Sequence, residues 1–194
     1  DGGCVHMKGR PVGLTNLVVH DNQAGGRGGA FFLDTYLSGT NNAALVNVSM
    51  SSNSAASSGG GVYCTGCFAT FAGTNAWGNS PDGYAGIVDP TGSSGNVSVD
   101  PLYLDVSGTT AALWDLHLGV GSPLVDAGSS SLLDPDGGPS DIGAYGGPDA
   151  DLWDLDGDGY PLWWMPGPYD ASTYPGLGWD CDDTDATVFP GSGC

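Results

Sequence analysis

A repeat in the first 80 residues limits most strongly how this chain can fold. In each unit a glycine-rich corner leads into a short apolar run, and the corners begin at Gly2, Gly28 and Gly59. A second segment of each unit closes on an asparagine, at Asn22, Asn53 and Asn79. The spacing of 26 to 31 residues is typical of proteins built by stacking one structural unit on the next.

Within each unit the apolar residues alternate with polar ones, for example Leu17 and Val19, then Val48 and Met50. A period of two predicts β-strands rather than helices. Short strands and glycine corners at this spacing predict an all-β fold, a parallel β-solenoid with about three short strands per coil. We expect the recurring asparagines to tolerate a left-handed backbone and to bond through their amides to the asparagines above and below.

The repeat loosens after Asn79, although strand patterns continue. Gly95 to Leu104 reads as strand, turn and strand, and Leu113 to Leu118 alternates again. No amphipathic pattern of ten or more residues predicts a helix anywhere in the chain.

Two aspartate clusters mark the C-terminal part. Alternating carboxylates in a glycine-kinked loop are the ligands that Ca²⁺ prefers, so we expect calcium here. The alternative is a set of Asp-rich turns that bind no ion. The loop departs from an EF-hand because Met165 stands where the bidentate Glu would be. The missing ligands are therefore expected from the second cluster. The predicted metal ligands are Asp154, Asp156, Asp158, the carbonyl of Tyr160, Asp180, Asp182, Asp183 and Asp185.

Asp134, Asp136 and Asp141 are candidates for a second oxygen site, but an ordinary Asp-Pro-Asp-Gly turn is the favoured interpretation. Copper prefers softer or imidazole ligands. No His follows His117, so calcium is preferred over copper.

The chain resembles known families. The Gly-Gly-Ala and Gly-Gly-Gly corners resemble polymorphic-outer-membrane-protein-like repeats of secreted bacterial β-helix proteins. The order of four motifs in residues 96–102, 116–118, 122–128 and 141–145 is similar to the closing signature of choice-of-anchor Q proteins. The resemblance implies a right-handed parallel β-helix over residues 1–147.

Residues 154–191 resemble the metal-binding motif of MopE-type secreted bacterial proteins. The matching positions are Asp154, Asp156, Gly157, Asp158, Gly159 and Tyr160, then Asp180, Cys181, Asp182, Asp183, Asp185, Pro190 and Gly191. We therefore expect an irregular, Asp-rich, calcium-binding cap over residues 148–194.

The charge balance excludes some partners. The net charge is −19, and all acidic residues are Asp. Such a charge argues against binding nucleic acid and against direct insertion into an anionic membrane. No run of 18 apolar residues and no signal peptide is present, which fits a chain that is cytosolic or already processed.

The five cysteines favour an oxidising compartment, so an extracellular or cell-surface location is expected. Cys181 and Cys194 flank the terminal loop and are candidates for a disulfide. Cys64 and Cys67 form a C-x-x-C pair that lacks the second pair of a zinc site. Either they pair locally or Cys4 pairs with one of them.

These patterns do not decide whether the chain is an enzyme, and a non-catalytic role is preferred. A glycosidase needs two carboxylates on one face, and Asp21 and Asp34 are the candidates in the regular repeats. The preferred function is an extracellular structural or adhesive β-solenoid, calcium-stabilised, in a surface or filamentous assembly. The alternative is a carbohydrate-active or carbohydrate-binding β-helix, with Phe32, Tyr63 and Trp77 as candidates for stacking on sugars.

The repeat starts at once, at Gly2, with no capping segment before it. An open end of a stacked repeat exposes strand edges and core. We therefore expect self-association, or stacking on a neighbouring chain, through this N-terminal coil.

Overall fold

The structure is a computed structural model that describes residues 1–9, 11–34, 42–119, 121–135, 137–150, 160, 180–182, 184, 185 and 187–194. Over these residues the fold is all-β, with one 3₁₀-helix, η1 (Ala111–Leu113), and no α-helix. The strands are β1 (Val5–Lys8), β2 (Val12–His20), β3 (Gln23–Ala24), β4 (Phe31–Asp34), β5 (Asn42–Ser51), β6 (Ser54–Ala55), β7 (Val62–Thr65), β8 (Phe68–Trp77), β9 (Tyr84–Ala85), β10 (Tyr103–Asp105) and β11 (Asp115–Leu118).

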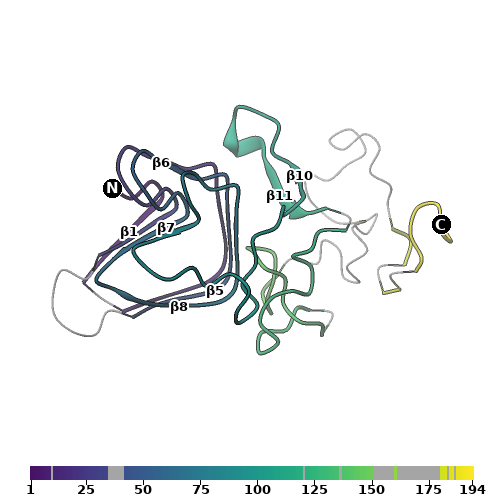
Figure 1. The fold of residues 1–194 in the computed structure, drawn as a ribbon. Helices are drawn as coiled ribbons and strands as arrows, with labels where there is room; N and C mark the ends of the chain where they lie inside the picture. Colours follow the sequence, from purple (N-terminus) through teal and green to yellow (C-terminus); the bar gives the residue numbers. More distant parts are fainter. Residues whose placement is uncertain are drawn as a thin grey trace.

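Strands from successive repeat units pair in parallel. The sheets have the orders β1-β4-β7-β9, β2-β5-β8 and β3-β6, so equivalent strands of neighbouring units lie side by side. The register follows the repeat, for example Val5 with Phe31 and Phe31 with Val62. Figure 1 looks along the stack and shows the units almost superposed around a common interior.

The asparagine ladder predicted from the sequence is confirmed. The Asn53 Oδ1 accepts hydrogen bonds from the Asn22 backbone N–H at 3.0 Å and from the Asn22 amide at 3.1 Å. Asn53 in turn donates from its backbone and its amide to the Asn79 Oδ1, both at 3.0 Å. Asn53 is fully buried, so these bonds satisfy polar groups that no water reaches.

The left-handed backbone lies one residue earlier than expected. The ladder asparagines are not the residues with positive φ, which are Asp21 (53°), Ser52 (58°) and Gly78 (62°). The preceding residue makes the sharp turn, and the asparagine then extends its amide along the stack. A second left-handed column, Asn16, Asn47 and Gly73, bends β2, β5 and β8 within their length.

The glycine corners are required by sterics. Gly28 has a φ of +70°, which favours glycine because it has no Cβ. At the next position the neighbouring unit approaches closely. A Cβ on Gly29 would lie 2.2 Å from the Gly60 carbonyl oxygen, and one on Gly60 would lie 2.3 Å from the Ser80 carbonyl oxygen.

The alternating apolar side chains fill the interior of the stack. Phe31, Leu45, Val48 and Val62 are fully buried in one cluster. Burying a side chain of this size contributes about 1.5–3 kcal/mol. At the first unit the equivalent positions are only half-buried; they are Val5, Leu14 and Leu17.

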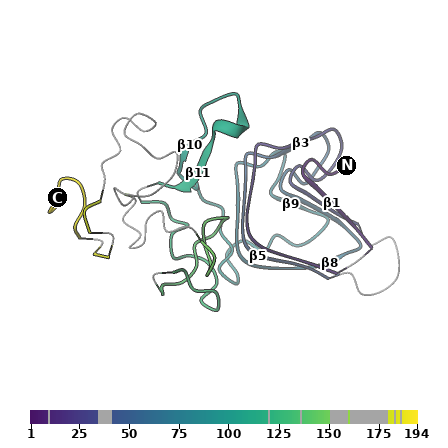
Figure 2. The ribbon, with the colours of Figure 1, turned by 180° about the vertical axis from the view of Figure 1, so that it is seen from behind.

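The other end of the stack is covered by residues 84–97. The Tyr84 ring packs edge-on against Phe71 at 5.2 Å, and the Asn96 amide donates to the Phe71 carbonyl at 3.0 Å. Burial raises the pKa of Tyr84 to about 12. Among the described residues these cover the end, whereas residues 180–194 lie apart from the stack in both views (Figures 1 and 2).

Residues 97–145 form a flank with its own small core. Leu118, Leu124 and Ile142 are buried together, and β10 and β11 pair antiparallel. Polar contacts join this flank to the outer side of the stack: the Tyr103 hydroxyl lies 2.8 Å from the Ser49 hydroxyl, and the Asn47 amide donates to the Ser140 hydroxyl at 2.8 Å. The segment 1–147 therefore holds a repeat core and a flank core.

Candidate functional site

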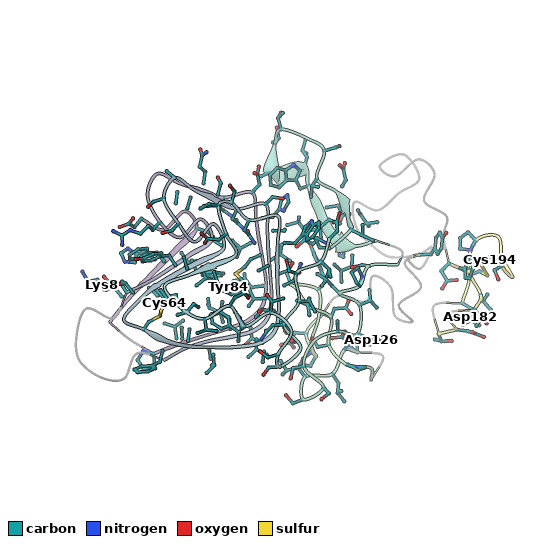
Figure 3. All side chains as sticks on the ribbon, viewed as in Figure 1. Lys8, Cys64, Tyr84, Asp126, Asp182 and Cys194 are labelled. Atoms are coloured by element: carbon teal, nitrogen blue, oxygen red, sulfur yellow. A yellow bond between two sulfur atoms is a disulfide. The ribbon has the colours of Figure 1, made fainter. Side chains whose placement is uncertain are left out.

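The candidate site is the Asp-rich C-terminal segment. Of its predicted ligands, Asp154, Asp156, Asp158 and Asp183 lie outside the described residues. Tyr160, Asp180, Asp182 and Asp185 are described. Figure 3 places Asp182 and Cys194 at the end of the molecule away from the repeat units.

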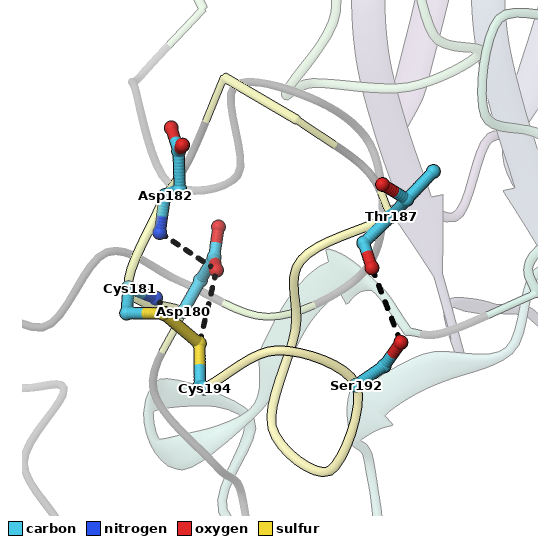
Figure 4. Close-up of a disulfide and its surroundings, with 6 residues drawn as sticks. All are labelled: Asp180, Cys181, Asp182, Thr187, Ser192 and Cys194. Carbon is cyan, nitrogen blue, oxygen red and sulfur yellow. Dashed lines mark hydrogen bonds between the residues drawn. A yellow bond between two sulfur atoms is a disulfide. The ribbon is translucent and has the colours of Figure 1, made fainter.

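Asp180 is the buried carboxylate of this segment. It is fully buried, and its Oδ1 accepts the backbone N–H of Asp182 at 3.0 Å (Figure 4). Its Oδ2 is also buried and has no hydrogen-bond partner among the described residues. Leaving such an atom unpaired costs about 1–3 kcal/mol, and more if the group is charged.

A disulfide between Cys181 and Cys194 closes the segment around Asp180, as the sequence suggested. The Cys181 backbone N–H lies 3.2 Å from the Cys194 Sγ, which itself lies 3.8 Å from the Asp180 Oδ1. The Asp180 carboxylate and both sulfurs lie within 4.8 Å of one another. Because the sulfurs are bonded to each other, they provide no thiolate ligand. Among these three side chains, the charge is therefore on Asp180.

Asp182 and Asp185 sit in exposed local turns. The Asp182 Oδ1 accepts the Thr184 hydroxyl at 2.7 Å. The Asp185 Oδ1 accepts the Thr187 hydroxyl at 2.7 Å and the Thr187 backbone N–H at 3.1 Å. These two hydrogen bonds, chiefly the one from the Thr187 hydroxyl, lower the pKa of Asp185.

Tyr160 contacts the C-terminal end of the chain. Its ring stacks on Phe189 with centroids 5.8 Å apart and an interplanar angle of 2°. This contact places Tyr160, which follows the first aspartate cluster in the sequence, beside Phe189, which follows the second.

Asp134 and Asp141, the described members of the second candidate oxygen site, accept backbone N–H groups of nearby residues. The Asp134 Oδ2 accepts the Asp141 backbone N–H at 2.9 Å, and its Oδ1 accepts the Gly147 backbone N–H. The Asp141 Oδ1 accepts the Asp126 backbone N–H at 2.8 Å. Asp136 lies outside the described residues. The favoured interpretation of Asp134 and Asp141 as turn residues therefore agrees with these contacts.

The sequence did not point to a buried acid–imidazole pair in the flank. The Asp115 Oδ1 lies 2.5 Å from the His117 Nδ1, and the Tyr145 ring stacks on the imidazole at 3.7 Å. Both members of the pair are buried. The feature of the sequence that relates to this pair is the polar–apolar alternation from Asp115 to Leu118. This alternation predicts a strand but does not show which face of it is buried.

The candidate sugar-stacking residues are partly covered. Phe32 stacks on Tyr63 at 5.4 Å, and Arg27 lies over the Tyr63 ring at 4.9 Å while donating to its hydroxyl. Phe32 is buried, whereas Trp77 is 41% exposed.

The candidate carboxylates for a glycosidase are not on one sheet. Asp34 ends β4, and Asp21 lies in the turn after β2. These strands belong to different sheets, so the structure does not place the two carboxylates on a common sheet face.

One family model matches part of the chain. Residues 47–65 match the Chlamydia polymorphic membrane protein repeat. The matched residues run from the bend of β5 through the glycine corner to the end of β7. No curated protein and no solved structure matches the chain. In the described part, no helix has the length and apolar character needed to cross a membrane.

Proposed function

We propose that the chain is part of an extracellular right-handed parallel β-solenoid with a structural or adhesive role at a bacterial surface. The observation that carries this proposal is the in-register parallel stacking of the repeat units, with a buried asparagine ladder along them. Parallel crossover connections are almost always right-handed. The match of residues 47–65 to a repeat of membrane proteins supports a surface location.

Calcium is proposed to stabilise the Asp-rich C-terminal module. The buried Oδ2 of Asp180, which has no donor among the described residues, supports a cation at this point, because a cation would satisfy this oxygen. For Asp182 and Asp185, the contacts among the described residues involve one carboxylate oxygen each, the Oδ1. Asp154, Asp156, Asp158, Asp183 and the Tyr160 carbonyl complete the proposed ligand set.

The calcium proposal is tested by thermal unfolding and limited proteolysis of the full chain, with Ca²⁺ and with EDTA. EDTA is expected to lower the melting temperature and to increase cleavage after about residue 150, because bound metal stabilises only the folded state. Asp180→Asn should reduce the response to Ca²⁺, while Asp89→Asn, on an exposed loop, should leave it unchanged. An identical response of all three proteins to EDTA would refute the proposal.

Self-association through the first unit is also proposed. β1 and β2 are edge strands whose apolar residues Val5, Leu14 and Leu17 are only half-buried. Another unit of the same kind, placed on this edge, would pair the strands and cover these side chains. Electron microscopy and light scattering should reveal assemblies, and Leu14→Asp should dissolve them. A monomer at all concentrations would contradict this part of the proposal.

A further inference from the structure

One histidine lies between the repeat stack and the flank. The His20 Nδ1 lies 2.8 Å from the Ser51 hydroxyl, on the neighbouring strand β5. The His20 ring also contacts two rings of the flank edge-on, Tyr103 at 5.5 Å and Trp114 at 5.1 Å. We call these four residues the His20 cluster.

The His20 cluster connects β2, β5 and the β10–β11 hairpin. The Tyr103 hydroxyl lies 2.8 Å from Ser49 and 3.4 Å from Ser51, so a chain of polar groups runs from the imidazole to β10. The Trp114 indole N–H donates to the Gly108 carbonyl at 2.6 Å, which fixes the hairpin loop behind the ring. The hairpin therefore rests on the stack through these two aromatic side chains.

The groups that face His20 give a protonated ring little support. From β5 it meets the Ser51 hydroxyl, and from the hairpin it meets the Tyr103 phenol and the Trp114 indole. The charged group acting on it is Asp21, which is exposed in the turn after β2. The hairpin also contains the buried Asp115–His117 pair, which is a separate titratable group.

We propose that His20 is an acid-sensitive latch that holds the β10–β11 hairpin against the outer face of β2 and β5. The neutral imidazole packs between the rings and Ser51. Protonation adds a charge to a half-buried ring whose surroundings, among the described residues, are neutral apart from Asp21, and the hairpin then loosens from the stack. Loosening exposes the Ser49 and Ser51 side chains, which the flank otherwise buries.

The direction of the pH dependence follows from the pKa of His20. Burial lowers this pKa, and the Asp21 charge raises it by less, so the net shift is downward. A His with a lowered pKa in the docked state stabilises docking above its free pKa of about 6.5 and loses that stability as the pH falls below it. The contacts of Asn47 with Ser140 and Ser129 involve no titratable group, so the rest of the flank should remain docked.

Hydrogen exchange on the full chain tests the latch. Amides of residues 103–118 are compared at about pH 7.5 and about pH 5 after correction for intrinsic exchange, together with the Trp114 indole resonance. We expect hairpin opening to rise by about threefold or more at the lower pH. His20→Gln, which stays neutral while retaining polar atoms near Ser51, should abolish the rise.

His6→Gln is the matched control, because His6 is exposed on β1 and contacts Phe32 rather than the flank. It should behave as the wild type does. His20→Phe, which keeps an aromatic ring without a titratable group, should also lose the pH dependence. The proposal is overturned if the wild-type hairpin does not open further at low pH, or if His20→Gln keeps more than half of the rise, which would assign it to Asp115–His117.

Discussion

Asparagine has two distinct tasks in this chain. In the ladder, the amide of Asn53 donates to the Val19 carbonyl at 2.8 Å and to the Asn79 amide oxygen, linking three successive units. In the bend column, Asn47 adopts a φ of 53° and donates to the Asn16 amide oxygen at 3.0 Å. The recurrence of the ladder asparagines was readable from the sequence, whereas the residue that takes the left-handed backbone was not.

Replacing Asn53 by Ala should destabilise the stack by about 3 kcal/mol, because several buried groups lose their partners at once. The Asn22 and Val19 backbone groups would both be affected. Asn22→Ala, at the half-buried end of the ladder, should cost about 1 kcal/mol. Denaturant unfolding measures both values, and equal losses would contradict the role assigned to burial.

The glycine corners yield a second prediction at the residue scale. Gly29→Ala should destabilise the fold by about 3 kcal/mol or more, since its Cβ would overlap the backbone of Gly60 and Ser54. Gly13→Ala is the matched control, because nothing lies within 4 Å of its Cβ. That change should be neutral or stabilising by about 0.5 kcal/mol. Melting curves of the two variants separate steric clash from a general effect of Gly replacement.

At the scale of elements, the repeat made the parallel strands predictable, since the same alternation recurs at the same register. The flank was less readable. Leu113 to Leu118 was interpreted as an alternating strand, but residues 111–113 form η1 and β11 pairs antiparallel with β10. Without a repeat, alternation indicates a strand but not its partner or its buried face. Asp115 and His117 were missed for this reason.

A disulfide lies between two consecutive strands of the repeat stack. The sequence left open whether Cys4 pairs with Cys64 or Cys67, and the structure places a disulfide between Cys64 and Cys67, with Cys4 unbonded and exposed. This bond closes the corner between β7 and β8. A loop this short contributes about 2 kcal/mol through the unfolded chain.

Replacing Cys64 and Cys67 together by Ala and Ser should therefore lower the free energy of unfolding by at least about 2 kcal/mol. Cys4→Ser should leave stability nearly unchanged. Peptide mapping of the wild-type chain under non-reducing conditions should recover Cys64 linked to Cys67. Recovery of Cys4 in a disulfide with either of them would contradict the pairing.

At the scale of the whole molecule, charge is distributed unevenly. All three basic residues, Lys8, Arg10 and Arg27, belong to the first repeat unit, while the net charge is −19. Arg27 lies over Tyr63 and 4.0 Å from the Asp1 carboxylate, so part of this small positive charge is already engaged. The remaining chain repels itself in the folded state, and dissolved ions must screen that repulsion.

Screening and specific metal binding can be separated because they depend on different features of the chain. Added NaCl is expected to raise the melting temperature of the full chain in EDTA. Most of the gain should come below about 0.2 M, because the Debye length shortens from about 30 Å at about 0.01 M to about 10 Å at about 0.1 M. This gain should be the same in Asp180→Asn, since removing one charge from −19 changes the overall repulsion little. Micromolar to millimolar Ca²⁺ at constant ionic strength should add a further increase in the wild type that Asp180→Asn reduces. Equal effects of Ca²⁺ and NaCl at matched ionic strength would mean that the Asp-rich module is stabilised by screening and not by a bound ion.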